Sequence, residues 1–542
     1  MFRLDDVHLK PPVKNEAEEL AKQAGAALGI SDVLITNLTI LKKSIDARKK
    51  DDIKYVYSIV FDLKGTGKGI EVAARHLKRS QSLTLYKPVS YELPRVIIKR
   101  NGDDDRPLIV GCGPAGLFCA YILSAAGLRP IVIERGERIV KRQKSVEAFW
   151  QNGVLNPESN IQFGEGGAGT FSDGKLYTGN NDKSGIHDEI LKVFVEYGAD
   201  PDIMSNAHPH IGTDVLKNVI VNMRCALERK GVEFLFETRF VKPLCDEKNR
   251  ATAAEIVKDN KISALKCGCI ILCTGHSARD LYKDLYDCGM EMEAKSFAVG
   301  FRIQHEQKMI NMSQYGPDHE RLKLPPAIYK LTAKASSGRG VYSFCMCPGG
   351  YGVNASSEPA RLAVNGMSSQ GRNGKNANSA IVVTVGPEEF GSGLFDGMEF
   401  QKKLEEKAYG LCKGSIPVQT LGDFMSRSGR ADHKGIEAEI KGKWAYASLN
   451  GLLPVSMEND IIEAFGSFGH TIKGFDDPGA LLAGIESRTS APLRMIRNEA
   501  GMSNITAVFP CGEGAGYAGG ITSAAADGIR TAEKVIKYMQ RV

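Results

Sequence analysis

The sequence predicts an α/β fold in which a Rossmann-like dinucleotide-binding domain is interrupted by an inserted α+β domain and preceded by a separate small module. Three observations support this prediction. A glycine-rich turn follows a short apolar strand near residue 111, and a second such turn lies 401 residues later (512 − 111). Strand and helix patterns alternate ahead of the first turn and fill residues 1–93.

The N-terminal module, residues 1–93, shows strand patterns interleaved with two helix patterns. In chain order the patterns cover residues 2–9, 15–30, 33–45, 54–63, 71–79 and 82–88. This β-α-β-β-α-β order is typical of the ferredoxin-like fold. Because no catalytic motif is present in the module, we interpret it as a docking or lid element. A polar linker is predicted over residues 94–106.

Positive charge is concentrated in the N-terminal part of the chain. Residues 1–100 contain 19 Lys and Arg against 12 Asp and Glu, a net charge of +7, whereas the whole chain carries +6. A basic face of this kind can bind an anionic partner such as RNA. The basic run over residues 42–50 is interrupted by Asp46 and followed by Asp51 and Asp52. We therefore favour a solvated basic face, and RNA binding stays the less favoured alternative.

The first glycine-rich turn has the spacing of a dinucleotide cradle. Gly111 lets the chain turn out of the strand, Gly113 lets the backbone approach a pyrophosphate, and Gly116 lets the next helix lie close to the sheet. That helix begins at Pro114 and Ala115, where unpaired N–H groups and the helix dipole favour phosphate. The turn therefore predicts a phosphate-binding site at the start of this helix.

An acidic residue follows the next strand at the distance expected of a ribose contact. Glu134 lies 18 residues after Gly116 (134 − 116) and can accept hydrogen bonds from ribose hydroxyl groups. The same carboxylate would repel a ribose 2′-phosphate, so we do not expect this pocket to hold NADP. Arg135 and Arg142 come next, and Arg142 is predicted either to neutralise a cofactor phosphate or to be a solvated helix charge.

The second glycine-rich turn, within residues 507–536, again separates an apolar strand from a helix. NAD dehydrogenases do not usually need such an element, whereas FAD uses it: the helix N-terminus can face the flavin pyrimidine, and an acidic residue after the strand holds the ribityl chain or its phosphate. A third apolar strand, residues 269–275, brings more backbone to the cofactor. The residues expected in these roles are Gly512, Glu513, Gly519, Gly520, Ile521, Thr274 and Gly275.

Over residues 107–285 and 500–542 the chain resembles the FAD-dependent oxidoreductases of the glutathione-reductase-like fold, although it has Gly512-Glu513 where those proteins usually have Gly-Asp. A narrower resemblance is to a bacterial family of large, poorly characterised FAD-dependent dehydrogenases. It is carried by QFGEGGAGTFSDGKL (162–176), TGHSARDLY (274–282), YSFCMCPGGY (342–351), NGMS (365–368), NANSAIVV (376–383) and SRTSAPLR (487–494). The resemblance implies the fold and FAD, and it implies no particular substrate.

The resemblance also places further contacts. The glycine-dense run 164–175 lies where related flavoproteins wrap the flavin ring, and the backbone of Val241 would meet the adenine. Residues 286–499 would form the substrate domain. Only one GxGxxG turn is followed by an acid, so either NAD(P)H would need a transient site within residues 286–499 or the electrons would come from the substrate itself. This resembles the aromatic hydroxylase and reductase branch. The contacts expected from the glycine-dense run are Gly166, Gly167, Gly169 and Thr170.

Candidates for proton transfer are weaker than those for cofactor binding. His276 ranks first because it directly follows the Thr-Gly turn, and Lys175 or Ser172 could reach the flavin N5 region. Other histidines, at 208, 210 and 470, rank lower. Cys345 and Cys347 are interpreted as packed strand residues, because a Cys-x-Cys pair in a regular strand is poorly placed to close a disulfide.

Composition excludes several classes of protein. Hydrophobic residues make up 42% and charged residues 25%, which is typical of a globular protein. The N-terminus lacks a signal-peptide pattern and no stretch reaches membrane-spanning length, so we expect a cytoplasmic protein. Twelve scattered cysteines are expected to be reduced, and none has zinc or iron–sulfur spacing.

These observations predict a FAD-dependent oxidoreductase that transfers hydride at flavin N5 to or from a small organic molecule. Two alternatives stay open. A flavin-dependent RNA-modification enzyme would use the basic N-terminal module to hold RNA. A non-catalytic flavoprotein that senses redox state would keep the cofactor and lack turnover.

Overall fold

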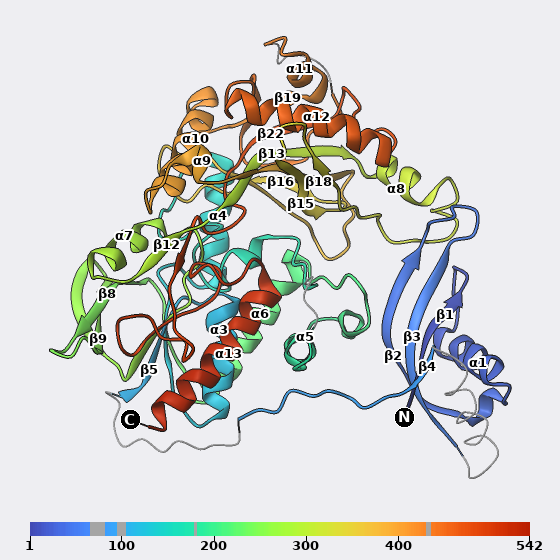
Figure 1. The fold of residues 1–542 in the computed structure, drawn as a ribbon, viewed down its shortest axis with the longest axis horizontal. Helices are drawn as coiled ribbons and strands as arrows, with labels where there is room; N and C mark the ends of the chain where they lie inside the picture. The colour runs from blue at the N-terminus through green and yellow to red at the C-terminus, as the bar shows by residue number, and fades with distance from the viewer. Residues whose placement is uncertain (65–81, 95–104, 178–181, 430–434, 542) are drawn as a thin grey trace. The chain divides into compact units, whose positions relative to one another are not determined.

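The computed structural model describes residues 1–64, 82–94, 105–177, 182–429 and 435–541, which divide into two compact units (Figure 1). The expected helix over 71–79 and most of the linker 94–106 lie outside the described residues. The first unit combines Met1–Tyr91, Gly179–His210 and Lys308–Ala327. The second combines Glu92–Thr178, Ile211–Gln307 and Ile328–Val542.

The first unit is built on an antiparallel sheet with strand order β2-β3-β1-β4. Helix α1 begins at the Asn15 cap and ends at Gly29, which takes the left-handed conformation common after helices. Apolar residues of α1 and of the sheet, Leu20 and Tyr57 among them, form its core. The elements are β1 (Phe2–Leu9), α1 (Glu16–Leu28), a 3₁₀ turn (Asp32–Leu34), β2 (Ile35–Asp46), β3 (Lys54–Leu63), β4 (Leu83–Leu85), α5 (Ile186–Glu196), a 3₁₀ turn (Pro201–Met204) and most of α8 (Gln307–Tyr315).

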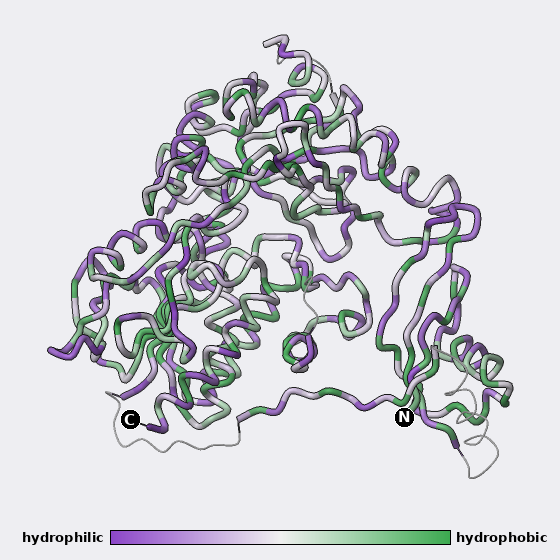
Figure 2. The backbone as a smooth tube through the Cα atoms, viewed as in Figure 1, coloured by the Kyte–Doolittle hydropathy of each residue, from purple (hydrophilic) through white to green (hydrophobic). Residues whose placement is uncertain are grey.

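The second unit contains a parallel sheet with strand order β24-β11-β5-β6-β7. The strands β5, β6, β11 and β24 are short, buried and apolar, as expected of strands covered by helices on both faces, and hydrophobic residues gather there (Figure 2). Helices α3 and α13 pack against each other. The elements are β5 (Pro107–Val110), α3 (Pro114–Ala125), β6 (Ile131–Ile133), α4 (Ile139–Asn152), a 3₁₀ turn (Ala168–Phe171), α6 (Thr213–Arg229), β7 (Glu233–Leu235), β11 (Cys269–Leu272), α7 (Arg279–Asp287), β24 (Val508–Pro510) and α13 (Ile521–Met539).

A second, larger sheet of this unit has the order β14-β15-β18-β13-β22-β19-β21. Its strands are β13 (Phe297–Glu306), β14 (Thr332–Lys334), β15 (Gly340–Cys347), β18 (Asn376–Val385), β19 (Ile416–Thr420), β21 (Trp444–Tyr446) and β22 (Leu481–Glu486). The helices of this region are α9 (Pro387–Phe390), α10 (Asp396–Cys412), α11 (Leu421–Ser426) and α12 (Val455–Thr471).

In the described part of this unit, three further sheets are small. Their strands are β8 (Thr238–Cys245), β9 (Ala251–Lys258) and β10 (Lys261–Lys266); β16 (Tyr351–Asn354), β17 (Val364–Met367) and β20 (Ile440–Lys441); and β12 (Met292–Ala294) with β23 (Leu493–Met495). Among the helices of the described ranges, none combines the length and the apolar character needed to cross a bilayer.

Candidate cofactor and catalytic site

The turn between β5 and α3 leaves no room for side chains at two of its three glycines. Gly111 has a φ of +108°, and a Cβ there would lie 2.5 Å from the Cys273 carbonyl oxygen. At Gly116 a Cβ would lie 2.0 Å from the carbonyl oxygen of Gly111. Only glycine at both positions lets α3 start this close to the ends of β5 and β11.

The middle glycine is different, because space rather than protein faces it. Gly113 has an ordinary φ of −82°, and the nearest atom to a Cβ built there is the Gly167 Cα at 3.8 Å. Gly113 is the N-cap of α3, and no side chain caps that helix end, where Pro114 is the first residue. The N–H groups of the first turn therefore face an uncrowded space that suits a phosphate.

Glu134 ties three backbone segments together beside this turn. Its buried carboxylate accepts hydrogen bonds from the N–H groups of Cys112, Gly136 and Gly164, each at 2.9 Å. A carboxylate offers about four acceptor positions, so one position is left for a ribose hydroxyl. The residue that the sequence assigns to ribose also fixes the shape of the cradle.

Arg142 stabilises the glycine-dense loop and the residues just before it through hydrogen bonds. Its guanidinium donates to the carbonyl oxygens of Asn160, Ile161 and Glu165 at 2.7 to 2.9 Å. The side chain is fully buried, so it is not the solvated helix charge that the sequence allowed. Burial lowers the pKa of Arg142 to about 10. The guanidinium is hydrogen-bonded to three backbone carbonyl groups and to no carboxylate. Arg142 therefore stabilises the conformation of the loop.

Arg135 is held by ion pairs. It donates to Glu158 at 2.9 and 3.0 Å and to Asp280 at 3.0 Å, and its guanidinium lies 4.3 Å from the centre of the Phe163 ring. These pairs raise the pKa of Arg135, although burial acts in the opposite direction. Arg135 thus connects the end of β6 to the start of α7.

The glycine-dense loop reaches the start of both long helices. A Cβ on Gly167 would lie 3.0 Å from the Cα of Gly113, and a Cβ on Gly169 would lie 2.9 Å from the Ile521 side chain. Gly166 takes a φ of +83° beside the buried Thr170. The loop therefore brings the α3 and α13 N-termini to one place, as a cofactor that contacts both requires.

Thr274 and Gly275 at the end of β11 lie beside the second glycine turn. A Cβ on Gly514 would lie 2.0 Å from the Thr274 carbonyl oxygen, and a Cβ on Gly512 would lie 2.9 Å from the Ala115 Cβ of α3. At Gly275, Gly519 and Gly520 a Cβ would meet nothing within 4 Å. These three positions border open space.

Unsatisfied polar atoms gather beside that space. The Nδ1 of His276 lies 3.2 Å from the Glu513 carboxylate, which leaves its Nε2 buried and without a hydrogen-bond partner among the described residues. The hydroxyl groups of Thr274 and Ser277 are in the same condition. Because buried polar atoms are nearly always satisfied in proteins, three such atoms next to the cradle fit a polar ligand.

The structure also shows the local backbone geometry at Val241 and Ser172, two other residues named from the sequence. The β8–β9 pairing shifts register between Phe240 and Lys242, on either side of Val241, as a β-bulge does. Ser172 donates to the Gly169 carbonyl oxygen at 2.8 Å and accepts from the Gly174 N–H at 3.0 Å. Ser172 thus stabilises the turn of the loop.

Lys175 lies in a polar cluster that the sequence did not reveal. Its ammonium is 3.0 Å from Asp173, which also pairs with Arg372 at 2.6 Å and accepts from Ser368. Burial acts to lower the pKa of Lys175, but the negative charge of Asp173 and of nearby thiols raises it overall. Lys175 therefore stays protonated and is a weak acid.

Asp527 is a second residue without a sequence motif. It lies on α13, accepts from the Gly512 N–H at 2.8 Å and pairs with Arg497 at 2.8 and 3.0 Å. It therefore fixes the second glycine turn against the helix. The sequence gives no signal for this role, because aspartate is common in helices and its partners here are distant in sequence.

The strand that carries Cys345 and Cys347 is not regular, contrary to the interpretation from sequence. The β15–β18 pairing shifts register between Phe344 and Cys347, and Cys345 takes a φ of +47°. The cause is distant in sequence: Arg302 of β13 donates to the Cys345 carbonyl oxygen at 3.3 Å and pairs with Glu486 of β22. The strand bends at this point.

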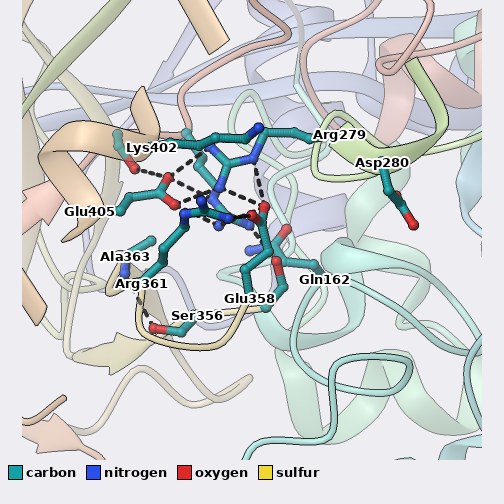
Figure 3. A network of polar contacts seen from close by, with 12 residues as sticks. Gln162, Arg279, Asp280, Ser356, Glu358, Arg361, Ala363, Lys402 and Glu405 are labelled. Carbon is teal, nitrogen blue, oxygen red and sulfur yellow. Dashed lines mark hydrogen bonds and ion pairs between the residues drawn. The ribbon is translucent and has the colours of Figure 1, made fainter. Parts of the chain in front are cut away.

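A buried network of charges includes Arg279, which follows the Thr274-Gly275 turn in the sequence (Figure 3). Arg279, at the start of α7, donates to Glu358 at 2.6 Å and to both carboxylate oxygens of Glu405 at 2.6 and 3.2 Å. Arg488 donates to the same carboxylate twice at 2.9 Å. The network connects the His276 segment to α10. Among the described residues, no three His, Cys, Asp or Glu side chains are arranged to bind a metal.

Family models match three parts of the chain. Residues 106–280 match the FAD binding domain, residues 296–489 match the C-terminal domain-like part of FAD-dependent proteins, and residues 1–62 match a domain of unknown function. An uncharacterised protein of Clostridium beijerinckii is 42% identical over 547 residues, which cover 99% of this chain and 98% of that protein.

Solved structures show weaker similarity. CtdE in complex with FAD has a TM-score of 0.30 at 12% identity and covers 80% of this chain and 88% of its own. The 3-ketosteroid-Δ4-(5α)-dehydrogenase of Rhodococcus jostii has a TM-score of 0.33 at 11% identity, covering 79% and 95%. Aklavinone-11 hydroxylase with FAD and aklavinone has a TM-score of 0.33 at 12% identity, covering 81% and 64%.

Proposed function

Since this chain belongs to a poorly characterised family of FAD-dependent proteins, with an uncharacterised Clostridium beijerinckii protein among its members, we propose that it is an oxidoreductase acting on a small organic molecule. Its cofactor is FAD. The reaction we propose is hydride transfer at flavin N5, with NAD(P)H as a transient electron donor or with the substrate as the donor.

The observation that carries this proposal is the convergence of two uncapped helix N-termini on one glycine-lined space. The starts of α3 and α13 have no side-chain caps, and Gly167 and Gly169 join them. In such a site α3 would hold the pyrophosphate and Glu134 the ribose, while α13 would stabilise negative charge on the flavin pyrimidine. Bound FAD would supply acceptance or delivery of hydride at N5.

His276 and Lys175, the two candidates for proton transfer, suit different roles. His276 is the better proton donor or acceptor of the two candidates, because its Nε2 has no partner and its Nδ1 is oriented by Glu513. Lys175 is paired with Asp173 and has a raised pKa, so it suits orientation and charge stabilisation. The glycine-dense loop would exclude water from one side of the site.

Reduction by a deuterated nicotinamide tests the reaction type. Under anaerobic conditions, NADH or NADPH should remove the visible absorbance of the bound flavin, and deuterium at the transferred position should slow this step by a primary isotope effect. The same readout applies to any organic substrate found by screening. A flavin that only dithionite reduces, with no response to hydride donors of any class, would contradict the proposed reaction.

Adding a carboxylate at the start of α13 should make the flavin potential more negative. Gly519 is exposed and a Cβ there meets nothing within 4 Å, so Gly519→Asp and Gly519→Asn should both fold. The aspartate would oppose the negative charge of the reduced flavin. Helix N-termini favour anions by roughly 0.3 to 2 kcal/mol, so a two-electron potential should fall by roughly 10 to 40 mV. Spectroscopic redox titration measures the shift, and equal potentials in the two variants would place this helix end away from the flavin.

A further inference from the structure

The bend in β15 exposes two neighbouring cysteines to one polar cluster. Cys345 is a non-glycine residue in the left-handed region, a conformation that persists only where the surroundings hold it. Here the surroundings are the fully buried Arg302, whose Nη1 is 3.3 Å from the Cys345 carbonyl oxygen, and the Cys347 thiol, whose Sγ is 3.2 Å from the same oxygen. Cys345 is partly exposed and Cys347 is buried.

Two positively charged side chains contact the pair, one at the Cys347 sulfur and one at the Cys345 carbonyl oxygen. Lys175 Nζ lies 3.9 Å from Cys347 Sγ, and the Arg302 guanidinium is next to the Cys345 backbone. A hydrogen bond from Cys347 and the charges of Lys175 and Arg302 lower the pKa of the Cys345 thiol, whereas the pKa of Cys347 is raised. The other ionisable groups around the pair are Asp173, Arg372, Tyr177 and Glu486.

The cluster belongs to the cofactor end of the second unit. Lys175 is followed by Leu176, whose carbonyl oxygen accepts a hydrogen bond from Thr522 Oγ1 at 2.6 Å. Thr522 is the second residue of α13, the helix whose start borders the open space beside the cradle. Because β15 bends between Phe344 and Cys347, the side-chain directions of a regular strand do not apply to this pair.

We propose that Cys345 and Cys347 form a redox-active thiol pair that undergoes thiol–disulfide exchange with low-molecular-weight disulfides. The Cys345 thiolate attacks one sulfur of a disulfide RSSR, forming a mixed disulfide between Cys345 Sγ and one RS group as the S–S bond of RSSR breaks and RS⁻ leaves. Cys347 then gives its proton to the first RS⁻ and its thiolate attacks Cys345 Sγ. The mixed S–S bond breaks, the Cys345–Cys347 disulfide forms, and the second RS⁻ leaves and takes a proton from water. The two protein thiols lose two electrons, and one disulfide becomes two thiols. This inference goes beyond the proposed flavin reaction and does not depend on its substrate.

Peptide mapping of the full-length protein tests the pair directly. The reduced, desalted protein is treated with oxidised glutathione and digested with trypsin, which should give a peptide of residues 340–361 containing only these two cysteines. We expect this peptide to lose the mass of two hydrogen atoms. In Cys347→Ser, glutathione should instead remain attached to Cys345, and in Cys345→Ser, Cys347 should stay unmodified. Both thiols remaining free in the wild-type peptide, while the exposed Cys245 is modified, would overturn the proposal.

The pH dependence of alkylation tests the role assigned to Lys175. Between about pH 6.5 and 8 the rate of iodoacetamide reaction at Cys345 should be nearly constant, because the thiol is already ionised. Burial and the nearby Cys288 and Asp246 raise the pKa of the Cys245 thiol. The rate of alkylation at Cys245 should therefore increase roughly tenfold per pH unit. Parallel profiles at the two cysteines would refute the proposal without any variant.

Two variants then separate charge from packing. Lys175→Arg should keep the constant profile, and Lys175→Gln should move its onset to higher pH. An unchanged Cys345 profile in a folded Lys175→Gln protein would show that Lys175 does not hold the thiolate.

Discussion

Replacing Gly113 with valine should abolish FAD binding and leave the protein folded. Gly113 has a φ that any residue can adopt, and the nearest atom to its Cβ position is 3.8 Å away, so the polypeptide itself has no need of glycine there. The space that the valine side chain would fill lies at the uncapped start of α3, where the pyrophosphate is expected. The measurement is the ratio of flavin to protein absorbance after purification, with the nucleotide released on denaturation identified as FAD or FMN by chromatography.

Two further glycines serve as controls for this experiment. Gly466 lies on α12 with nothing within 4 Å of its Cβ position, so Gly466→Val should keep full flavin content. Gly116→Ala should instead damage the fold, because its Cβ would lie 2.0 Å from the Gly111 carbonyl oxygen. Circular dichroism and thermal unfolding separate the two kinds of loss. Stoichiometric FAD in a folded Gly113→Val protein would show that this turn is not the phosphate site.

The parts of the site that depend on local chain geometry could be predicted from the sequence. The spacing of Gly111, Gly113 and Gly116 is a property of one strand, one turn and one helix, and a resemblance over six motifs then indicated FAD. The N-terminal strands and the helix after Asn15 were also predicted within a few residues, because their apolar periodicity and caps are local signals.

The parts that depend on distant partners could not be predicted. From sequence, Arg142 could be either a contact of a cofactor phosphate or a solvated helix charge, whereas in the structure it donates to carbonyl groups 18 to 23 residues away. Cys345 read as a strand residue, since nothing nearby reveals that Arg302 and Glu486 hold its backbone in a bend. Asp527 carries no motif at all, and its contact with Gly512 follows from the packing of α13 against the second glycine turn.

Glu405 offers the largest stability effect that the structure predicts. Its carboxylate is fully buried and accepts from Arg279, from Arg488 and from the Ser487 hydroxyl. Replacing it with glutamine would leave two nearly buried guanidinium groups with Glu358 as their shared carboxylate partner, at 2.6 Å from Arg279 and 3.6 Å from Arg488. Removing one partner of a buried ion pair typically costs about 3 to 5 kcal/mol. We therefore expect Glu405→Gln to lower the temperature of the corresponding unfolding transition by several degrees.

The adjacent residue provides a matched control. Glu406 is half exposed and pairs with Arg361 at 2.9 Å, so Glu406→Gln should cost less than about 1 kcal/mol. The pH dependence distinguishes a charge effect from a packing effect. Burial acts to raise the pKa of Glu405, but the two arginines lower it below the 4.5 of an ordinary glutamate. The contribution of Glu405 to stability is therefore fully present above pH 4.5 and declines as the pH falls further. The difference in unfolding temperature between wild type and Glu405→Gln should therefore shrink on acidification. A difference that is equal at pH 7 and in acid would mean that the glutamine disturbs packing and that the arginines do not depend on this carboxylate.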